Sequence, residues 1–376
     1  MRISILQGAF LPVPTRRGGA VEKIWFSLGQ EFVRRGHEVT HVSRQCDDLP
    51  TEEMIGGVRH RRVRGFDAPT SLLRLKLCDL LYTRRAARVL PPADLVVTNT
   101  FWAPLLLSPA RHGKIWVHVQ RYPRGQMGCY RRAAQLQTVS GVIARAMVAQ
   151  SPAIAPRVSV IPNPLPTLVP AGRSTVRDPH LVLFVGRLHP EKGIHLLIEA
   201  MIILREQRPA ARLRVVGPWE ERFGGGGAAF LLALRAAAGP LGETVTFTGP
   251  VFDEAELSAH YDEAGVFVYP TLAAQGEASP VAPLEALAHG LPVVVSDLAC
   301  FDDTLFPGPF VHRFNHEAIS AASRLAGSLE AVLADPAGTA AVAAAARARS
   351  AAFSIEHIAG LYLEGFARVL AGPSPT

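Results

Sequence analysis

Short hydrophobic runs alternate along the chain with segments in which hydrophobic residues recur every three or four positions. Residues 2–7 form an apolar run that predicts a buried strand, and residues 20–35 have the spacing of an amphipathic helix. The loop between them, residues 8–19, contains glycine. Gly36 predicts the end of the helix, and the alternating residues 38–43 predict the next strand. This order of strand, glycine loop, helix and strand indicates a parallel α/β sheet.

The same alternation continues to about residue 140 and restarts after a segment rich in proline. Residues 158–177 contain four prolines and a polar run, which indicates a linker. Further strands are expected at residues 58–63, 95–98, 115–119, 136–139, 181–185, 212–216, 245–248, 266–269 and 293–296. Helices are expected over the alanine-rich residues 331–352 and the amphipathic residues 355–370. We therefore predict two doubly wound α/β domains, with substrates in a cleft at the carboxyl ends of their strands.

The composition is that of a folded globular protein. Of 376 residues, 48% are hydrophobic and 19% are charged. The four cysteines are far apart, so they indicate neither a zinc site nor a disulfide framework and fit a reducing compartment. Pro12 and Pro14 interrupt the apolar N-terminus, which makes a poor signal peptide, and no apolar stretch approaches the roughly 18 residues that span a membrane. We expect a cytoplasmic protein.

The charge differs between the two halves of the chain. Residues 1–170 contain 24 Lys and Arg against 10 Asp and Glu, whereas residues 171–376 contain 15 against 22, so the halves carry +14 and −7. A basic half attracts phosphates, anionic lipid headgroups or nucleic acid. The alternative is a basic surface that is only solvated.

Two cations follow a predicted strand in residues 184–193. The strand ends at Gly186, Arg187 comes next, and Lys192 precedes a helix. Cations at the carboxyl end of a strand, near a helix N-terminus, favour a phosphorylated ligand, and the alternative is an exposed pair on a loop. The glycine run 224–227 lacks the Lys-Ser or Lys-Thr of a phosphate loop and is expected to be a flexible surface loop.

Two carboxylates, Glu277 and Glu285, lie eight residues apart. Glu277 lies in a loop after a strand, and Glu285 lies inside a helix expected to begin near Val281. Both carboxylates can therefore face one ligand, and hydroxyl groups are their natural partners. A ligand with hydroxyls at both ends and phosphates between them is a nucleotide sugar.

These residues resemble the E-x7-E signature of retaining glycosyltransferases of family four, which have the GT-B architecture of two Rossmann-like domains. Other segments match the family in the same order: Gly18-Gly19, Ile161-Pro-Asn-Pro164, Gly186-Arg187 with Lys192, Val216-Gly217, Phe247-Thr-Gly249 followed by Glu256-Leu257 and Tyr261, Leu291-Pro-Val-Val-Val-Ser296 and Phe353-Ser-Ile-Glu356. The resemblance implies an acceptor-side domain over residues 1–168 and a domain that binds the nucleotide sugar over residues 169–354. Residues 355–376 would form a C-terminal helix that packs back on the first domain.

The resemblance also implies roles for the charged residues. Arg187 and Lys192 would hold the donor diphosphate and stabilise the leaving nucleotide. Glu285 would accept the ribose hydroxyls, and Glu277 the hydroxyls of the transferred sugar.

Backbone groups would complete the donor site. Gly18 and Gly19 would allow phosphates to approach the main chain, and the amides of Val281 and Ala282 would face the diphosphate. Base recognition would use the main chain near Gly217 and Gly249. One departure from the family is Ser279-Pro280, because Pro280 has no N–H group to offer.

The first domain contains the remaining site residues. His118 closes a strand where the family often has a histidine near the donor sugar, which favours a functional role, although a single histidine is more often structural. Arg121, Tyr122 and Arg124 follow it and are acceptor-side candidates.

Residues 71–90 contain five basic residues and a group of six leucines between residues 72 and 81. This pattern predicts either a helix at an anionic membrane surface or a packed helix with a solvated basic face. No nucleic-acid-binding motif is present, so we expect no nucleic-acid partner.

The leading hypothesis is a retaining hexosyltransferase that uses a UDP-linked or GDP-linked sugar and a glycan, lipid-linked or small-molecule acceptor. No D-x-D sequence occurs, so Arg187 and Lys192 are expected to replace a metal, and no cofactor is expected. The family mechanism of front-face transfer requires no separate protein base. The alternatives are a nucleotide-sugar epimerase of the same architecture and a subunit that only binds a nucleotide sugar or glycan.

Overall fold

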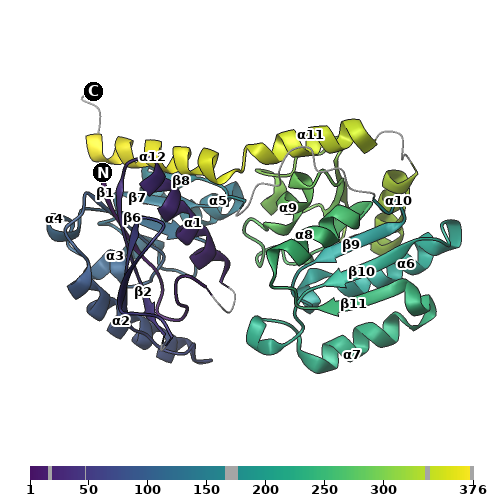
Figure 1. The fold of residues 1–376 in the computed structure, drawn as a ribbon, viewed down its shortest axis with the longest axis horizontal. Coiled ribbons are helices and arrows are strands. Elements are labelled where there is room, and N and C mark those ends of the chain that lie inside the picture. Colours follow the sequence, from purple (N-terminus) through teal and green to yellow (C-terminus); the bar gives the residue numbers. More distant parts are fainter. Residues whose placement is uncertain (16–18, 47, 166–176, 335–338, 373–376) are drawn as a thin grey trace. The chain divides into compact units, whose positions relative to one another are not determined.

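The computed structural model describes residues 1–15, 19–46, 48–165, 177–334 and 339–372 (Figure 1). It divides into two compact units, Met1–Pro166 with Ser354–Thr376, and Thr167–Phe353. Each unit contains one sheet of mostly parallel strands, so the prediction of two doubly wound α/β domains is confirmed. The predicted boundary at residues 168 and 169 lies outside the described residues.

The sheet of the first unit has eight strands in the order β3-β4-β2-β1-β5-β6-β7-β8. All neighbouring pairs are parallel except β3 with β4. The strands are β1 (Arg2–Leu6), β2 (Glu38–Gln45), β3 (Glu52–Ile55), β4 (Val58–Arg64), β5 (Leu95–Thr98), β6 (Lys114–Val119), β7 (Gln135–Thr138) and β8 (Val158–Val160). The helices are α1 (Ala20–Arg34), α2 (Leu72–Val89), α3 (Ala103–Leu106), α4 (Pro109–His112), η1 (Met127–Cys129), α5 (Gly141–Gln150) and η2 (Pro152–Arg157).

Two edge strands of this sheet were not predicted. β3 is short and carries two glutamates, so its sequence lacks the apolar alternation of a strand. β8 lies in the segment predicted as a linker, but its three residues pair in parallel with β7. The linker prediction is therefore wrong for residues 158–160, because strand pairing outweighed the local proline content.

The terminal helix α12 (Ile355–Ala371) belongs to the first unit. Its Tyr362 and Phe366 pack in one hydrophobic cluster with Trp25 and Phe32 of α1 and Trp116 of β6. Figure 1 shows this last, yellow helix lying along the purple and blue part of the chain. The core of the first unit is thus completed by residues from the far end of the sequence.

The sheet of the second unit has six parallel strands in the order β11-β10-β9-β12-β13-β14. They are β9 (Leu181–Val185), β10 (Arg212–Val216), β11 (Val245–Gly249), β12 (Val266–Tyr269), β13 (Val293–Ser296) and β14 (Val311–Phe314). The helices are η3 (Pro190–Lys192), α6 (Ile194–Gln207), η4 (Glu221–Phe223), α7 (Gly227–Ala237), η5 (Gly239–Thr244), α8 (Glu254–Glu263), α9 (Ala282–Ala288), η6 (Ala299–Phe301), α10 (Ala321–Leu333) and α11 (Thr339–Ala351).

Two predictions for this unit need correction. The edge strand β14 was not expected. The alanine-rich residues 331–352 are not one helix, because they comprise the end of α10 and the separate helix α11. Helix propensity alone does not show where a helix begins or ends. Among the described residues, no helix is long and apolar enough to cross a membrane.

Candidate functional site

Three of the predicted donor-site glycines meet at the carboxyl ends of β9, β10 and β11. The Gly186 amide donates to the Val216 carbonyl over 2.9 Å, and the Gly217 amide donates to the Gly249 carbonyl over 2.9 Å. Gly217 has φ +145°, and a Cβ there would lie 1.9 Å from the Gly186 carbonyl oxygen. Glycine is therefore required at residue 217 for these strand ends to approach each other.

The turn that contains Lys192 is fixed against the segment after β12. Gly193 has φ +68°, and a Cβ there would lie 2.0 Å from the Pro270 carbonyl oxygen. The Leu272 amide also donates to the Glu191 carbonyl over 2.7 Å. Because β9 and β12 are neighbours in the sheet, the residues that follow these two strands are brought together.

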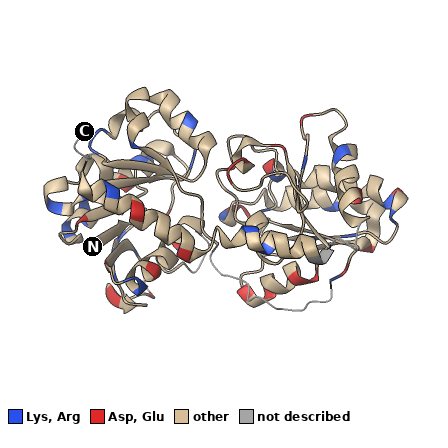
Figure 2. Cartoon of the chain, turned by 90° about the horizontal axis from the view of Figure 1, so that it is seen from above, with Lys and Arg blue, Asp and Glu red and all other residues tan. Residues whose placement is uncertain are grey.

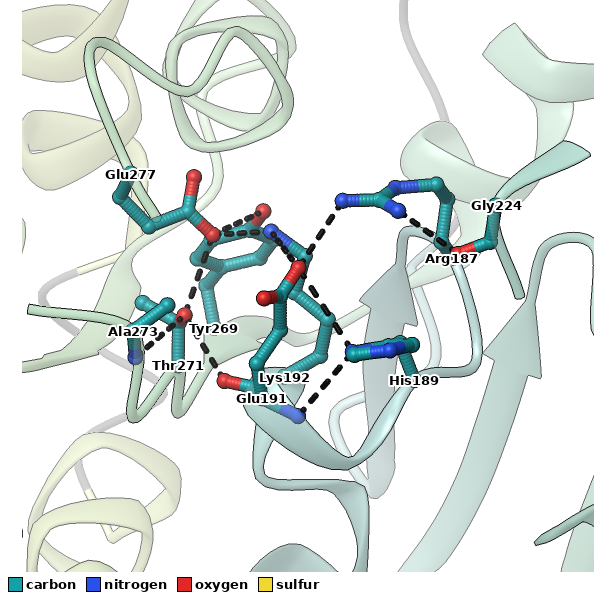
Figure 3. A network of polar contacts seen from close by, with 9 residues as sticks. All are labelled: Arg187, His189, Glu191, Lys192, Gly224, Tyr269, Thr271, Ala273 and Glu277. Atoms are coloured by element: carbon teal, nitrogen blue, oxygen red, sulfur yellow. Dashed lines mark hydrogen bonds and ion pairs between the residues drawn. The ribbon is translucent and has the colours of Figure 1, made fainter. Parts of the chain in front are cut away.

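Lys192 of this turn forms a buried ion pair with Glu277, which lies in the segment between β12 and α9 (Figure 3). Their exposed fractions are 5% and 6%. The Oε1 atom of Glu277 also accepts hydrogen bonds from the Tyr269 hydroxyl over 3.1 Å and the Thr271 hydroxyl over 3.0 Å. Sequence reasoning assigned Lys192 and Glu277 to separate parts of a ligand and did not predict that they pair with each other.

Burial, followed by the negative charge of Glu277, raises the pKa of Tyr269 well above its usual value. The phenol therefore remains a hydrogen-bond donor at neutral pH. Its ring stacks on Phe184 with 5.9 Å between centroids, and the Lys192 Nζ atom lies 5.5 Å from the centroid of the Tyr269 ring.

Arg187 lies beside this pair with its side chain 42% exposed. Its Nη2 atom donates to Glu191 Oε1 over 2.9 Å, and its Nη1 atom donates to the Gly224 carbonyl over 2.6 Å. Glu191 Oε1 also lies 4.0 Å from Lys192 Nζ. Sequence reasoning missed Glu191, because residues 187–191 are not an α-helix and their spacing alone does not show that the two side chains meet.

The glycine run is not the flexible surface loop that we predicted. Its amides donate to fixed carbonyls, with Gly226 bonded to Leu188 over 2.7 Å and Gly227 to Trp219 over 2.8 Å. Gly225 is buried, and a Cβ there would lie 2.2 Å from the main chain of Trp219. The run therefore packs closely because it lacks side chains, and it presents a carbonyl to Arg187.

Glu285 lies half-buried in α9 and accepts a hydrogen bond from the Tyr261 hydroxyl over 2.9 Å. The Tyr261 ring stacks on His289 with 5.1 Å between centroids, and His289 Nδ1 lies 2.7 Å from Asp262. Burial, and then the charge of Glu285, raise the pKa of Tyr261. A chain of buried side chains from α8 to the end of α9 therefore supports this carboxylate. Of its other members, only Tyr261 was matched to the family, and none was assigned a role in the site.

The two amides expected to face the diphosphate lie where α9 begins. Val281 is the N-cap residue, and Ala282 is the first helical residue. Pro280 and Pro283 stand on either side of them, so these are the two N–H groups available within that stretch.

In the first unit, Gly19 is the N-cap residue of α1 with φ +109°, and Gly18 lies outside the described residues. Glu22, which sequence reasoning missed, lies directly beneath Gly19, since a Cβ on Gly19 would be 2.7 Å from its Oε2 atom. Burial raises the pKa of Glu22, while its own backbone amide and the charge of Arg121 oppose that rise.

His118 is buried within the first unit. Its Nδ1 atom lies 2.5 Å from Gln137 Oε1, which also accepts a hydrogen bond from Tyr362 of α12. The Gln137 amide group donates to two carbonyls, so its oxygen must accept, and Nδ1 therefore carries the His118 proton. Nε2 is then a buried acceptor with no partner among the described residues. Burial lowers the pKa of His118 to about 4, so the ring is neutral at pH 7.

The acceptor-side candidates Arg121, Tyr122 and Arg124 lie on the loop between β6 and η1. Both arginines are exposed, and Tyr122 is half-buried. The loop is held by Gln150, which accepts from the Gly125 amide over 3.0 Å and donates to the Pro123 carbonyl over 2.6 Å. The main chain between Arg121 and Arg124 is therefore fixed by hydrogen bonds to Gln150.

Across the described part of the chain, no group of three or more His, Cys, Asp or Glu residues is arranged to hold a metal ion. The four cysteines are free thiols.

The fold is the GT-B fold of glycosyltransferases. The chain superposes on a sucrose-phosphate synthase from Thermosynechococcus elongatus with a TM-score of 0.73 and 22% identity, covering 97% of this chain and 99% of that one. It superposes on Anabaena HepE, solved with UDP and glucose, with a TM-score of 0.69 and 19% identity, covering 98% and 99% of the two chains.

Part of the sequence also matches a known family. Residues 179–335, which lie in the second unit, match the model for glycosyl transferases group 1. The chain is 25% identical to spore coat protein SA of Bacillus subtilis over 79% of its own length and 81% of that protein. It is 35% identical to a phosphatidyl-myo-inositol mannosyltransferase of Mycobacterium leprae, over 35% of its own length and 32% of that enzyme.

Proposed function

We propose that this chain transfers a hexose from a nucleoside diphosphate sugar to a glycan, lipid-linked or small-molecule acceptor. The observation that carries the proposal is the group formed by Arg187, Lys192 and Glu277 at the carboxyl ends of β9 and β12. Two cations and a carboxylate that share one small volume suit a ligand with phosphates next to hydroxyls. The structural similarity to HepE, which has been solved with UDP-glucose, supports a nucleotide sugar as the donor.

The charges suggest how these residues would act. Arg187 and Lys192 would stabilise the negative charge that develops on the leaving diphosphate, since preorganised cations in a water-poor site act strongly on such charge. Glu277 would orient the hydroxyls of the transferred sugar, and Glu285 those of the ribose. We propose that the leaving phosphate itself helps to deprotonate the acceptor, so that the anomeric configuration is retained without a separate protein base.

Lys192 provides the sharpest test of this proposal. Lys192→Ala would leave the buried Glu277 carboxylate without its cation, so loss of activity and loss of folding would be confused. Lys192→Gln removes the charge but keeps a hydrogen-bond donor for Glu277. We expect it to lower kcat roughly 100-fold to 1,000-fold, as for the loss of one charge-stabilising group, and to lower the melting temperature less than Lys192→Ala does. Turnover like that of the wild-type protein would refute the diphosphate assignment.

Stereochemistry and metal dependence are tested separately. Proton NMR of the product formed early in the reaction is expected to show the anomeric configuration of the donor. Turnover is expected to continue in EDTA, because Arg187 and Lys192 would neutralise the charge of the diphosphate in place of a metal ion. An inverted product would exclude retention, and complete loss of activity that Mg²⁺ restores would exclude metal independence.

Incubation with donor alone separates this function from its alternatives. A glycosyltransferase is expected to hydrolyse the donor slowly or leave it unchanged, whereas an epimerase would produce a second nucleotide sugar detectable by NMR. A subunit that only binds would be stabilised by a donor without turning it over in the presence of any acceptor.

We also propose that the first unit binds an anionic membrane surface through α2. None of the six leucines in residues 72–81 is buried, and Leu73 and Leu77 are 80% and 55% exposed. The side chains that α2 buries are instead Asp79, Tyr82, Thr83 and Ala86. A packed helix would bury its leucines, so this exposure favours the membrane alternative.

The charge of the surroundings agrees with an anionic lipid surface. The basic residues Arg74, Lys76, Arg84, Arg85 and Arg88 lie on the same helix, and Figure 2 shows further Lys and Arg on other elements of the first unit. Leucines flanked by cations fit acyl chains beneath anionic headgroups.

Co-sedimentation with vesicles tests this surface. The wild-type chain is expected to bind phosphatidylglycerol vesicles and not phosphatidylcholine vesicles, and the double variant Leu73→Ser, Leu77→Ser is expected to lose that binding. Leu232→Ser is a matched control, because Leu232 is 65% exposed on α7 of the second unit. Equal binding by the double variant and the control variant would refute the role of α2.

A further inference from the structure

Among the described residues, the side-chain partners of Glu277 hold only one of its two carboxylate oxygens. Its Oε1 atom accepts from Lys192, from the Tyr269 hydroxyl and from the Thr271 hydroxyl. In Figure 3 the second oxygen points away from these three donors. The carboxylate is thus fixed on one side and open on the other.

The two hydroxyl donors are themselves fixed. Tyr269 ends β12, and its ring is nearly parallel to the rings of Phe184 and Phe267, with interplanar angles of 9° and 14°. Thr271 has a single hydroxyl proton, which can go to Glu277 Oε1 over 3.0 Å or to the Glu191 carbonyl over 3.1 Å, and the charged carboxylate is the stronger acceptor. The proton of Thr271 is therefore available to Glu277.

Glu277 needs such support because of its position. It lies between β12 and α9, in a stretch that has neither helix nor strand. A glutamate on such a loop has several rotamers, and fixing one of them costs conformational entropy. Two hydroxyl bonds to one oxygen select a single orientation before a ligand arrives, which lowers the cost of binding.

We propose that Tyr269 and Thr271 are positioning residues that aim the free oxygen of Glu277 at a hydroxyl of the transferred sugar. This inference rests on the proposed function. It assigns the two residues to recognition of the sugar and not of the nucleotide, because they act only through the carboxylate that would bind the sugar.

The test compares the affinity for a nucleotide sugar with the affinity for the matching nucleoside diphosphate. Calorimetric titrations use UDP-glucose with UDP, GDP-mannose with GDP, and ADP-glucose with ADP. We expect Tyr269→Phe and Thr271→Val each to weaken nucleotide-sugar binding roughly tenfold, the usual cost of one hydrogen bond to a charged group. The affinity for the nucleoside diphosphate is expected to stay within about twofold of the wild-type value. Thr271→Ser keeps a hydroxyl at this position, so it is expected to bind the nucleotide sugar as the wild-type chain does.

Tyr261→Phe is the matched control. Tyr261 is a buried tyrosine of the same unit that donates to the other carboxylate, Glu285. Because Glu285 would bind ribose, this variant is expected to weaken the binding of the nucleotide sugar and of its nucleoside diphosphate equally. Melting temperatures of all the variants report their folding.

The outcomes separate this inference from the function on which it rests. If the wild-type chain binds none of the three nucleotide sugars, the proposed function is overturned, and the positioning role with it. If the wild-type chain binds one of them, two results overturn the positioning role alone. These are an unchanged affinity in Tyr269→Phe, and an equal loss for the nucleotide sugar and the nucleoside diphosphate.

Discussion

The two units accommodate buried polar side chains in different ways. In the second unit, the Oε1 atom of Glu277 is surrounded by three donors. In the first unit, His41 of β2 and His60 of β4 stack 5.3 Å apart with no partner for any ring nitrogen among the described residues. Glu277 is therefore buried as an ion with its partners, whereas His41 and His60 are buried without hydrogen-bond partners among the described residues.

This difference has an electrostatic cause. A buried carboxylate is tolerated when a cation and hydrogen bonds compensate for its lost hydration. A buried imidazole avoids that cost by remaining neutral, and burial lowers the pKa of His41. For His60, burial and the nearby charge of Arg62 lower the pKa to about 4, although Glu53 opposes the shift. The buried ion pair and the buried histidines are therefore expected to respond differently to acid.

The largest expected effect is that mild acid destabilises the first unit before the second. Below the usual histidine pKa of about 6.5 the unfolded chain binds protons that folded His60 and His118 do not bind until about pH 4. The free energy of unfolding should therefore fall as the pH drops from about 6.5 towards 4, on the order of 3 kcal/mol for His118 alone.

Tryptophan fluorescence during urea unfolding at pH 7.5 and pH 5 measures this difference. Trp25, Trp102 and Trp116 report on the first unit and Trp219 on the second. His60→Phe keeps an aromatic ring beside His41 and should reduce the pH dependence of the first unit. The comparison fails if Trp219 responds to acid before the other three.

A smaller effect is expected from the glycine run of the second unit. Gly225→Ala places a Cβ 2.2 Å from the main chain of Trp219, so we expect a loss of about 1–3 kcal/mol from overpacking. Donor binding should also weaken, because the run presents the carbonyl that holds Arg187. Gly239→Ala is the control, since nothing lies within 4 Å of a Cβ at that position. Similar melting temperatures for the two variants would show that the run tolerates side chains.

The smallest expected effect concerns α12 in the first unit. Gly365→Ala places a Cβ 2.6 Å from the Trp116 ring, whereas Gly360→Ala meets only the end of the Arg35 side chain at 3.3 Å. Alanine favours a helix over glycine by about 1 kcal/mol, so Gly360→Ala should be neutral or slightly stabilising. Gly365→Ala should be about 1–2 kcal/mol less stable than Gly360→Ala, because ring and helix must move apart. Urea unfolding measures the stability of both variants. Equal stabilities would show that α12 does not pack tightly on β6.

Sequence patterns predicted the central strands of both sheets well but their edges poorly. Residues 95–98, 181–185, 212–216, 266–269 and 293–296 are strands with the predicted bounds. Central strands are apolar runs because both faces are covered. The missed strands β3, β8 and β14 are edge strands of three or four residues, and their formation depends on a neighbour distant in the sequence.

The candidate site was predictable in its members but not in its contacts. The spacing of Glu277 and Glu285 and the cations after Gly186 follow from local sequence, as do the glycines at the strand ends. Tyr269 and Thr271 show no local pattern that distinguishes them from ordinary polar or core residues, and Tyr261 matched the family without a role. Their hydrogen bonds to the two carboxylates are visible only in the structure, as are the contacts of Glu191 with Arg187 and Lys192.

The sequence by itself determined the alternation of strands and helices, since hydrophobic periodicity and glycine positions act over a few residues. It also determined which charged residues follow which strands. Only the tertiary structure decided that Lys192 pairs with Glu277, 85 residues away, because that contact requires β9 and β12 to be neighbours in the sheet. The same holds for α12, whose packing on Trp116 depends on the fold returning the end of the chain to the first unit.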